Sequence, residues 1–183
     1  MGPTAIILII LAVLFVFFVV FISMKNNINR TIIKIDEASA GIDVALQKRY
    51  DVLTKMLDVV KAYTKYEKET ILDVINLRKG MNMNEKADAT KKIDEGFSKL
   101  SVVAEAYPEL KSSENYKTLQ QAIADTEEHL QAARRMFNSN VSRLNQLIVS
   151  FPTSVVASSM GVTKRDFFEV DEAKKEDVKM DFE

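Results

Sequence analysis

The sequence contains no cysteine, one histidine, five glycines and three prolines among 183 residues. The absence of cysteine excludes disulfides, thiolate metal sites and lipids attached to cysteine. The single histidine, His129, provides no set of imidazole ligands for zinc and no second histidine for a nucleophilic triad. The scattered glycines form no phosphate-binding loop. Few glycines and prolines, with many Leu, Ile, Ala, Glu and Lys residues, indicate long helices.

Charged side chains are absent from the first 24 residues, although the chain has 25 Lys or Arg and 26 Asp or Glu. Residues 5–22 read AIILIILAVLFVFFVVFI, and with Thr4 and Ser23 this run spans roughly 30 Å as a helix, the thickness of the hydrocarbon core. A signal peptide would have a basic residue before the run and a small-residue cleavage site after it, and the sequence has neither. We therefore expect residues 1–24 to form a single, retained transmembrane anchor.

The charges after the apolar run predict the orientation. Lys25, Arg30 and Lys34 follow it, and only Asp36 and Glu37 offset them nearby. The positive-inside rule then predicts a protein of the cell membrane with its N-terminus outside and its C-terminal domain in the cytoplasm. The part after residue 24 has a net charge close to zero, so no basic face for nucleic acid is expected.

Apolar residues after position 27 recur at intervals of three, four and seven, which is the spacing of a helix packed along one stripe. This coiled-coil-like pattern predicts a long first helix from about residue 27 to residue 78. Its stripe consists of Ile28, Ile32, Ile35, Ile42, Leu46, Leu53, Leu57, Val60, Ile71 and Val74.

A second helix is expected over about residues 85–106, where Asn82 or Asn84 can cap its start and Tyr107-Pro108 ends it. Its inward residues are expected to be Ala89, Ile93, Phe97, Leu100, Val103 and Ala104.

A third helix follows a cap at Ser112 or Ser113 and ends before Phe151-Pro152. Residues 153–160 fit a short fourth helix that Gly161 closes. The stripe of the third helix consists of Leu119, Ile123, Thr126, Leu130, Ala133, Phe137, Val141, Leu144 and Ile148.

Helices with one-sided stripes bury them against one another. We therefore predict an all-α protein, with an N-terminal transmembrane helix followed by an antiparallel three- to four-helix bundle that has a long first helix. The bundle would span residues 25–161, and residues 162–183 would form a charged, mostly flexible tail. Phe167 and Phe168 are the exception in this tail. One or both should dock near the Phe151-Pro152 turn, and if they stay exposed they are candidates for partner binding.

The residues predict no catalytic, cofactor or metal site. Asp43, Asp51 and Asp58 recur on one face of the first helix, but lysines beside them favour a solvated face with ion pairs. Glu67 falls where the stripe of the first helix expects an apolar residue. A polar residue there can fix the register of the bundle, the interpretation we favour, or it can bind a ligand or metal.

Three stretches resemble the LemA family of bacterial membrane proteins. They are residues 42–71 (IDVALQKRYDVLTKMLDVVKAYTKYEKETI), 104–138 (AEAYPELKSSENYKTLQQAIADTEEHLQAARRMFN) and 150–173 (SFPTSVVASSMGVTKRDFFEVDEA). With the anchor they cover nearly the whole chain in the family's order, and YPELK and FP…FFEV are the most specific elements. The resemblance implies a long-helix bundle behind an N-terminal anchor, an outside N-terminus and a cytoplasmic domain. It implies no particular reaction.

The chain departs from the family at three places. The family usually has Tyr-Asn where this chain has Phe137-Asn138 and Leu144-Asn145. It usually has two basic residues and then a small polar residue or histidine where this chain has Lys48-Arg49-Tyr50. The apolar exchanges keep the stripe, so they affect a role for the tyrosine hydroxyls and not the fold.

The leading functional hypothesis is a membrane-anchored scaffold or protein-interaction module without catalytic activity. Its expected partners are the lipid bilayer, an unidentified protein and a second copy, because the first helix offers more apolar stripe than two shorter helices cover. The alternative is a ligand- or metal-binding bundle that uses buried polar residues such as Glu67. A third hypothesis is an enzyme that uses carboxylates alone. Carboxylates converging inside the bundle would favour the last two.

Overall fold

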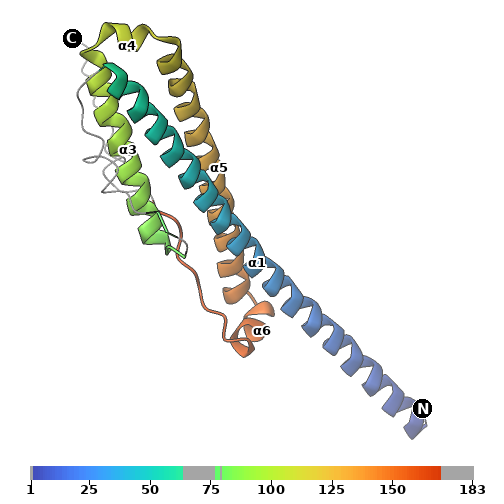
Figure 1. Cartoon of the computed structure of the whole chain (residues 1–183). Helices are drawn as coiled ribbons and strands as arrows, with labels where there is room; N and C mark the ends of the chain where they lie inside the picture. The colour runs from blue at the N-terminus through green and yellow to red at the C-terminus, as the bar shows by residue number, and fades with distance from the viewer. Residues whose placement is uncertain (1, 64–76, 79, 170–183) are drawn as a thin grey trace, which may run out of the picture. The chain divides into compact units, whose positions relative to one another are not determined.

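The computed structural model describes residues 2–63, 77–78 and 80–169, and these residues form helices and no strand (Figure 1). The prediction of an all-α helical bundle with a long first helix is confirmed. The helices are α1 (Pro3–Tyr63), α3 (Met83–Glu105), α4 (Pro108–Ser112), α5 (Glu114–Val149) and α6 (Thr153–Ser159).

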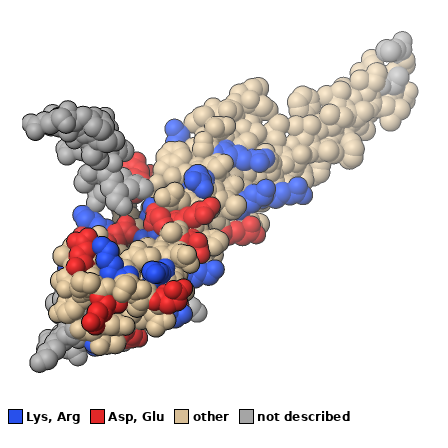
Figure 2. Space-filling view, turned by 90° about the horizontal axis from the view of Figure 1, so that it is seen from above, with Lys and Arg blue, Asp and Glu red and all other residues tan. Residues whose placement is uncertain are grey.

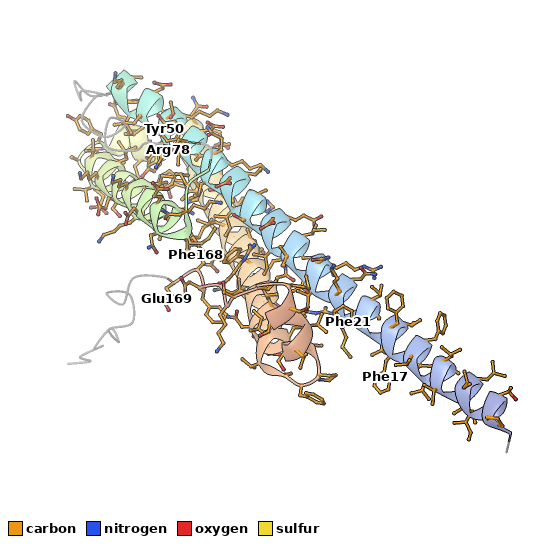
Figure 3. The ribbon with its side chains drawn as sticks, turned by 90° about the horizontal axis from the view of Figure 1, so that it is seen from below. Phe17, Phe21, Tyr50, Arg78, Phe168 and Glu169 are labelled. Carbon is orange, nitrogen blue, oxygen red and sulfur yellow. The ribbon has the colours of Figure 1, made fainter. Side chains whose placement is uncertain are left out.

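The first helix, α1, is unbroken over 61 residues, so the apolar segment continues directly into the bundle. Within the described part of the chain, α1 is the one helix long and apolar enough to cross a membrane. The large apolar side chains at its N-terminal end, residues 6–22, are exposed, from 38% at Ile22 to 69% at Phe17. In Figure 2 this end of α1 carries no Lys, Arg, Asp or Glu, and in Figure 3 Phe17 and Phe21 point away from the helix.

The chain divides into two compact units. Unit 1 comprises Met1–Ala38 and Met136–Phe167, and therefore contains the start of α1, the end of α5 and α6. Here α5 runs antiparallel to α1, since Arg143 meets Asn27 while Asn140 meets Lys34. The core of this unit consists of Ile28, Ile35, Ala38, Phe137, Val141, Leu144, Val156 and Ala157.

Unit 2 comprises Ser39–Arg135 and Phe168–Glu183. Its described helices are the end of α1, α3, α4 and the start of α5. The α1 and α3 helices run in the same direction, because Asp43 meets Lys86 and Arg49 meets Asp94. The α5 helix runs antiparallel to both (Figure 1). This parallel pair differs from the antiparallel packing that the sequence predicted for the bundle helices. The core includes Ile42, Leu46, Leu53, Met56, Leu57, Val60, Ala89, Ile93, Phe97, Leu100, Leu110 and Leu130.

Side-chain caps define the helix ends. The Asn82 side chain accepts a hydrogen bond of 3.0 Å from the backbone N–H of Glu85, and the Glu85 carboxylate accepts one of 2.8 Å from the N–H of Asn82. This capping box starts α3, so Asn82 and not Asn84 is the cap. The short helix α4, in which Pro108 occupies the first helical position, was not predicted. The predicted fourth helix is present as α6, and Gly161 after it has a φ of 66°.

The apolar stripes are largely buried as predicted. On α3 only Val103 is half-buried, and on α5 the half-buried positions are Leu119, Ile123, Ala133 and Ile148. On α1 only Ile32 is half-buried, and Ile71 and Val74 lie outside the described residues. The predicted end of the first helix at residue 78 is wrong, because Leu77 and Arg78 are not helical.

Candidate functional site

A buried arginine lies at the centre of unit 2. Arg49 continues the seven-residue spacing of Ile35 and Ile42, and only 3% of it is exposed. Its guanidinium donates hydrogen bonds to Asp94 of α3 and Glu127 of α5, and it also lies 5.5 Å from the centre of the Phe97 ring. One side chain on α1 thus joins all three long helices of this unit.

A second arginine, Arg134 of α5, belongs to the same cluster. Burial lowers the pKa of the Arg134 guanidinium, while the carboxylates of Glu127 and Asp94 act in the opposite direction. Two arginines and two carboxylates leave the cluster without net charge. The Nε atoms of Arg49 and Arg134 are buried without a hydrogen-bond partner in the described part of the chain. An unsatisfied buried donor costs free energy, so these two Nε atoms offset part of the stability that the ion pairs contribute.

Lys86 of α3 is a second buried cation among the described residues of unit 2. Its Nζ donates hydrogen bonds to the backbone oxygen of Ser39, at 3.0 Å, and to the Ser39 hydroxyl, at 2.8 Å. It also lies 2.7 Å from Oδ1 of Asp43, an ion pair that lacks the alignment of a hydrogen bond. This contact fixes the register of α3 against α1, close to the start of α3.

Phe168 attaches the C-terminal segment to unit 2. Its ring lies 4.9 Å from the guanidinium carbon of Arg134 and is 4% exposed, whereas Phe167 is 44% exposed. The prediction that one phenylalanine docks on the bundle is confirmed. The contact was predicted near the Phe151-Pro152 turn, and the ring contact that the structure shows is with Arg134 of α5. Figure 3 shows Phe168 next to Glu169, which is exposed.

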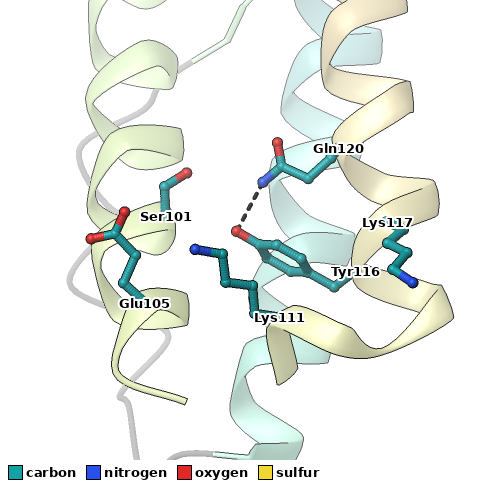
Figure 4. A pocket seen from close by; sticks show the side chains of 6 residues that line it. All are labelled: Ser101, Glu105, Lys111, Tyr116, Lys117 and Gln120. Atoms are coloured by element: carbon teal, nitrogen blue, oxygen red, sulfur yellow. Dashed lines mark hydrogen bonds between the residues drawn. The ribbon is translucent and has the colours of Figure 1, made fainter. Parts of the chain in front are cut away.

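An open pocket of about 450 Å³ lies between α3, α4 and α5 (Figure 4). Gln120 donates a hydrogen bond of 2.8 Å to the hydroxyl of Tyr116 at its wall. No described residue here pairs a nucleophile with a base, so the pocket offers no evident chemistry. Its lining residues are Ser101, Glu105, Lys111, Tyr116, Lys117 and Gln120.

The residues singled out in the sequence have different outcomes. Glu67 lies outside the described residues. Asp43 pairs with Lys86, while Asp51 accepts a hydrogen bond from Gln47 on the exposed face of α1, as expected for a solvated face. His129 is exposed on α5. The described residues contain no group of three metal-ligating side chains.

Burial of Arg49 and Lys86 was not predicted, although the sequence contains a signal for both. Arg49 follows Ile42 by seven residues, and Lys86 precedes Ile93 by seven, so each charge occupies a stripe position of its helix. A cation at such a position predicts an inter-helix ion pair, in the way that we interpreted Glu67.

These features define a helical bundle protein with an apolar N-terminal helix and an apolar core that contains buried ion pairs. The chain belongs to the LemA family, whose sequence profile matches residues 38–182. It is 29% identical over 163 residues to Protein LemA of Metamycoplasma hominis, an alignment that covers 86% of this chain and 74% of that protein. The resemblance found in the sequence is therefore confirmed. Family membership fits a non-catalytic helical protein, and together with the apolar helix it is consistent with a membrane-anchored one.

Proposed function

We propose that this chain is a single-pass protein of the cell membrane whose helical bundle is cytoplasmic and serves as a non-catalytic scaffold or interaction module. The observation that carries the proposal is the unbroken α1 helix, which contributes both the apolar segment and one side of the bundle. An anchor that continues into the bundle as one helix holds the bundle next to the bilayer, ready for partners there.

The buried charges are used in helix packing, which leaves the surface of the bundle as the part that could bind partners. Arg49 and Lys86 are each paired with groups on neighbouring helices. The carboxylates of Asp94 and Glu127 converge on Arg49, so they form part of the helix packing. The ligand- or metal-binding alternative depends on Glu67, which lies outside the described residues.

The basic residues beside the apolar segment support a cytoplasmic bundle. Lys25, Arg30 and Lys34 are exposed on α1, and in unit 1 Arg143 of α5 donates a hydrogen bond of 3.3 Å to Asn27. The folded chain thus adds a fourth basic residue close to the end of the apolar segment, on the side where the positive-inside rule expects positive charge.

The natural sequence lacks cysteine, so single cysteines can report the orientation. Gly2→Cys should react with a membrane-impermeant maleimide in intact cells, and Lys48→Cys only after lysis. The reverse pattern would place the bundle outside. Full-length protein should also stay with membranes in alkaline carbonate, and its extraction into the soluble fraction would refute the anchor.

The interaction role is tested by affinity purification from detergent-solubilised membranes, with co-purifying proteins identified by mass spectrometry. Arg49→Ala should lose partners because it loosens the contacts among α1, α3 and α5, whereas Lys48→Ala, at the exposed position beside it, should keep them. A second copy with a different tag reports a homo-oligomer. If both variants recover the same proteins at the same level, the bundle is not the interacting element.

A further inference from the structure

Unit 1 contains a second segment without charge. From Leu144 to Thr163, twenty consecutive residues include no Asp, Glu, Lys or Arg, and basic residues flank the segment at Arg143 and Lys164. The segment covers the last turns of α5, the Phe151-Pro152 turn and α6. We call it the uncharged corner. Surface segments of soluble domains usually carry charges, so this composition needs an explanation.

The hydrogen bond between Arg143 and Asn27 sets the level of the corner along α1. Asn27 is two residues past Lys25, the first charge after the apolar segment. Because α5 is antiparallel to α1, its six further residues to Val149 extend about 9 Å back towards the apolar segment. That distance reaches the last turn of the apolar segment, where Phe21 lies. Figures 1 and 3 both show α6 beside this part of α1.

Three apolar side chains of the corner are turned outwards. Phe151 is 84% exposed, and Val149 and Val155 are 61% and 60% exposed. The corner itself is well held, because Val156 and Ala157 of α6 are buried and the Thr153 hydroxyl donates a hydrogen bond of 2.7 Å to the backbone oxygen of Leu147. These exposed apolar groups thus belong to a fixed part of unit 1.

We propose that the uncharged corner is a second membrane contact, at which Phe151, Val149 and Val155 enter the boundary between lipid headgroups and acyl chains. Lys25 and Arg143 are exposed at the base of the corner and face the phosphate groups. The inference rests on the proposed anchor. The position level with the end of the apolar segment, together with the missing charge, favours lipid over a protein partner as the occupant.

The test uses full-length protein in lipid vesicles with one spin label at a time on an introduced cysteine. Collision rates with oxygen, which concentrates in lipid, and with a water-soluble nickel chelate report the surroundings of each label. Phe151→Cys and Val155→Cys probe the corner. Phe17→Cys is the lipid control. Ile33→Cys is the water control, because Ile33 is an exposed apolar residue of unit 1 that lies after Lys25 and Arg30.

At Phe151 and Val155 the ratio of oxygen to nickel collisions should approach that at Phe17 and exceed that at Ile33. If both corner labels match Ile33 while Phe17 is lipid-exposed, the corner contact is refuted and the anchor remains. If both corner labels are shielded from both reagents, a protein or a second copy covers them and the lipid contact is refuted. A water-exposed Phe17 refutes the anchor, and the corner contact with it.

Discussion

The guanidinium carbon of Arg134 lies 4.9 Å from the centre of the Phe168 ring, so a cation–π contact fastens the C-terminal segment to α5. The same Arg134 belongs to the charge cluster around Arg49. Through Phe168, the C-terminal segment therefore contacts the cluster of charged residues in unit 2.

Phe168→Ala should destabilise the protein much more than Phe167→Ala. Burying such a ring contributes about 1.5–3 kcal/mol, and the contact with Arg134 adds roughly 0.5–1 kcal/mol. Phe167 is far more exposed and should contribute little. The free energy of unfolding in urea, followed by circular dichroism, measures both variants. Equal losses would contradict the observed difference in burial.

Arg49→Ala should cost several kcal/mol, because it removes the partner of both Asp94 and Glu127. Breaking a buried ion pair typically costs about 3–5 kcal/mol, and the lower end applies here since the two carboxylates are 28% and 37% exposed. Arg49→Met should cost less because it keeps the packing. Lys48→Ala, on the exposed face, is the matched control and should change the unfolding free energy by less than about 0.5 kcal/mol. A control as damaging as Arg49→Ala would refute the assignment.

The helical phase of α5 predicts the effect of truncations along it. Leu130→Ala and Phe137→Ala should each cost about 2–5 kcal/mol, because both side chains are buried, whereas Gln131→Ala should be tolerated. The sequence alone would also have predicted tolerance at Glu127. The structure corrects this, since Glu127→Ala removes an acceptor of Arg49, and a loss between the two groups is expected. Chemical denaturation of the four variants ranks them, and equal values would show the phase to be wrong.

Asn82→Ala should remove about 1 kcal/mol through loss of the α3 cap. Asn84→Ala is the matched control, because Asn84 lies in the first turn of α3 without capping it. Thermal unfolding of both variants tests this, and a comparable fall in the midpoint for Asn84→Ala would contradict the capping box.

The capping box also predicts a dependence on pH. The backbone N–H of Asn82 lowers the pKa of the Glu85 carboxyl, and Arg78 acts in the same direction. A folded pKa below the unfolded one means that the stabilisation is complete above the unfolded pKa and is lost as pH falls through the folded pKa. The stability difference between the natural protein and Glu85→Gln should therefore shrink in acid. A difference that stays constant from neutral to acidic pH would contradict this.

The helices and their inward faces could be predicted from the sequence because burial repeats with the helical period. Leu130 and Phe137, seven residues apart, are both buried as the stripe of α5 predicts. The direction of α3 relative to α1 could not be predicted, because an apolar stripe can pack against a neighbouring helix in either a parallel or an antiparallel orientation. Contacts such as that between Lys86 and Asp43 fix it, and they depend on side chains far apart in the sequence.

The candidate site was less predictable than the fold. We searched for groups that could perform chemistry, whereas the polar groups buried in unit 2 hold helices together. Arg49 and Lys86 occupy stripe positions and could have been found by that rule alone. The contact between Phe168 and Arg134 could not have been predicted from the sequence, because it depends on the path of the chain after α6.

Because α1 is unbroken, the rotation of the packed part of unit 1 about the α1 axis is coupled to the rotation of the apolar segment. One residue inserted between Lys25 and Asn27 would turn the packed part of unit 1 by about 100° around the helix axis and move it by about 1.5 Å along that axis. Seven inserted residues would restore the angle to within roughly 20° but move the uncharged corner about 10 Å along the axis, away from the apolar segment. A rotation of the apolar segment about the α1 axis, such as the proposed anchor could undergo in a bilayer, would therefore be transmitted to Ile28 and the helices packed on it.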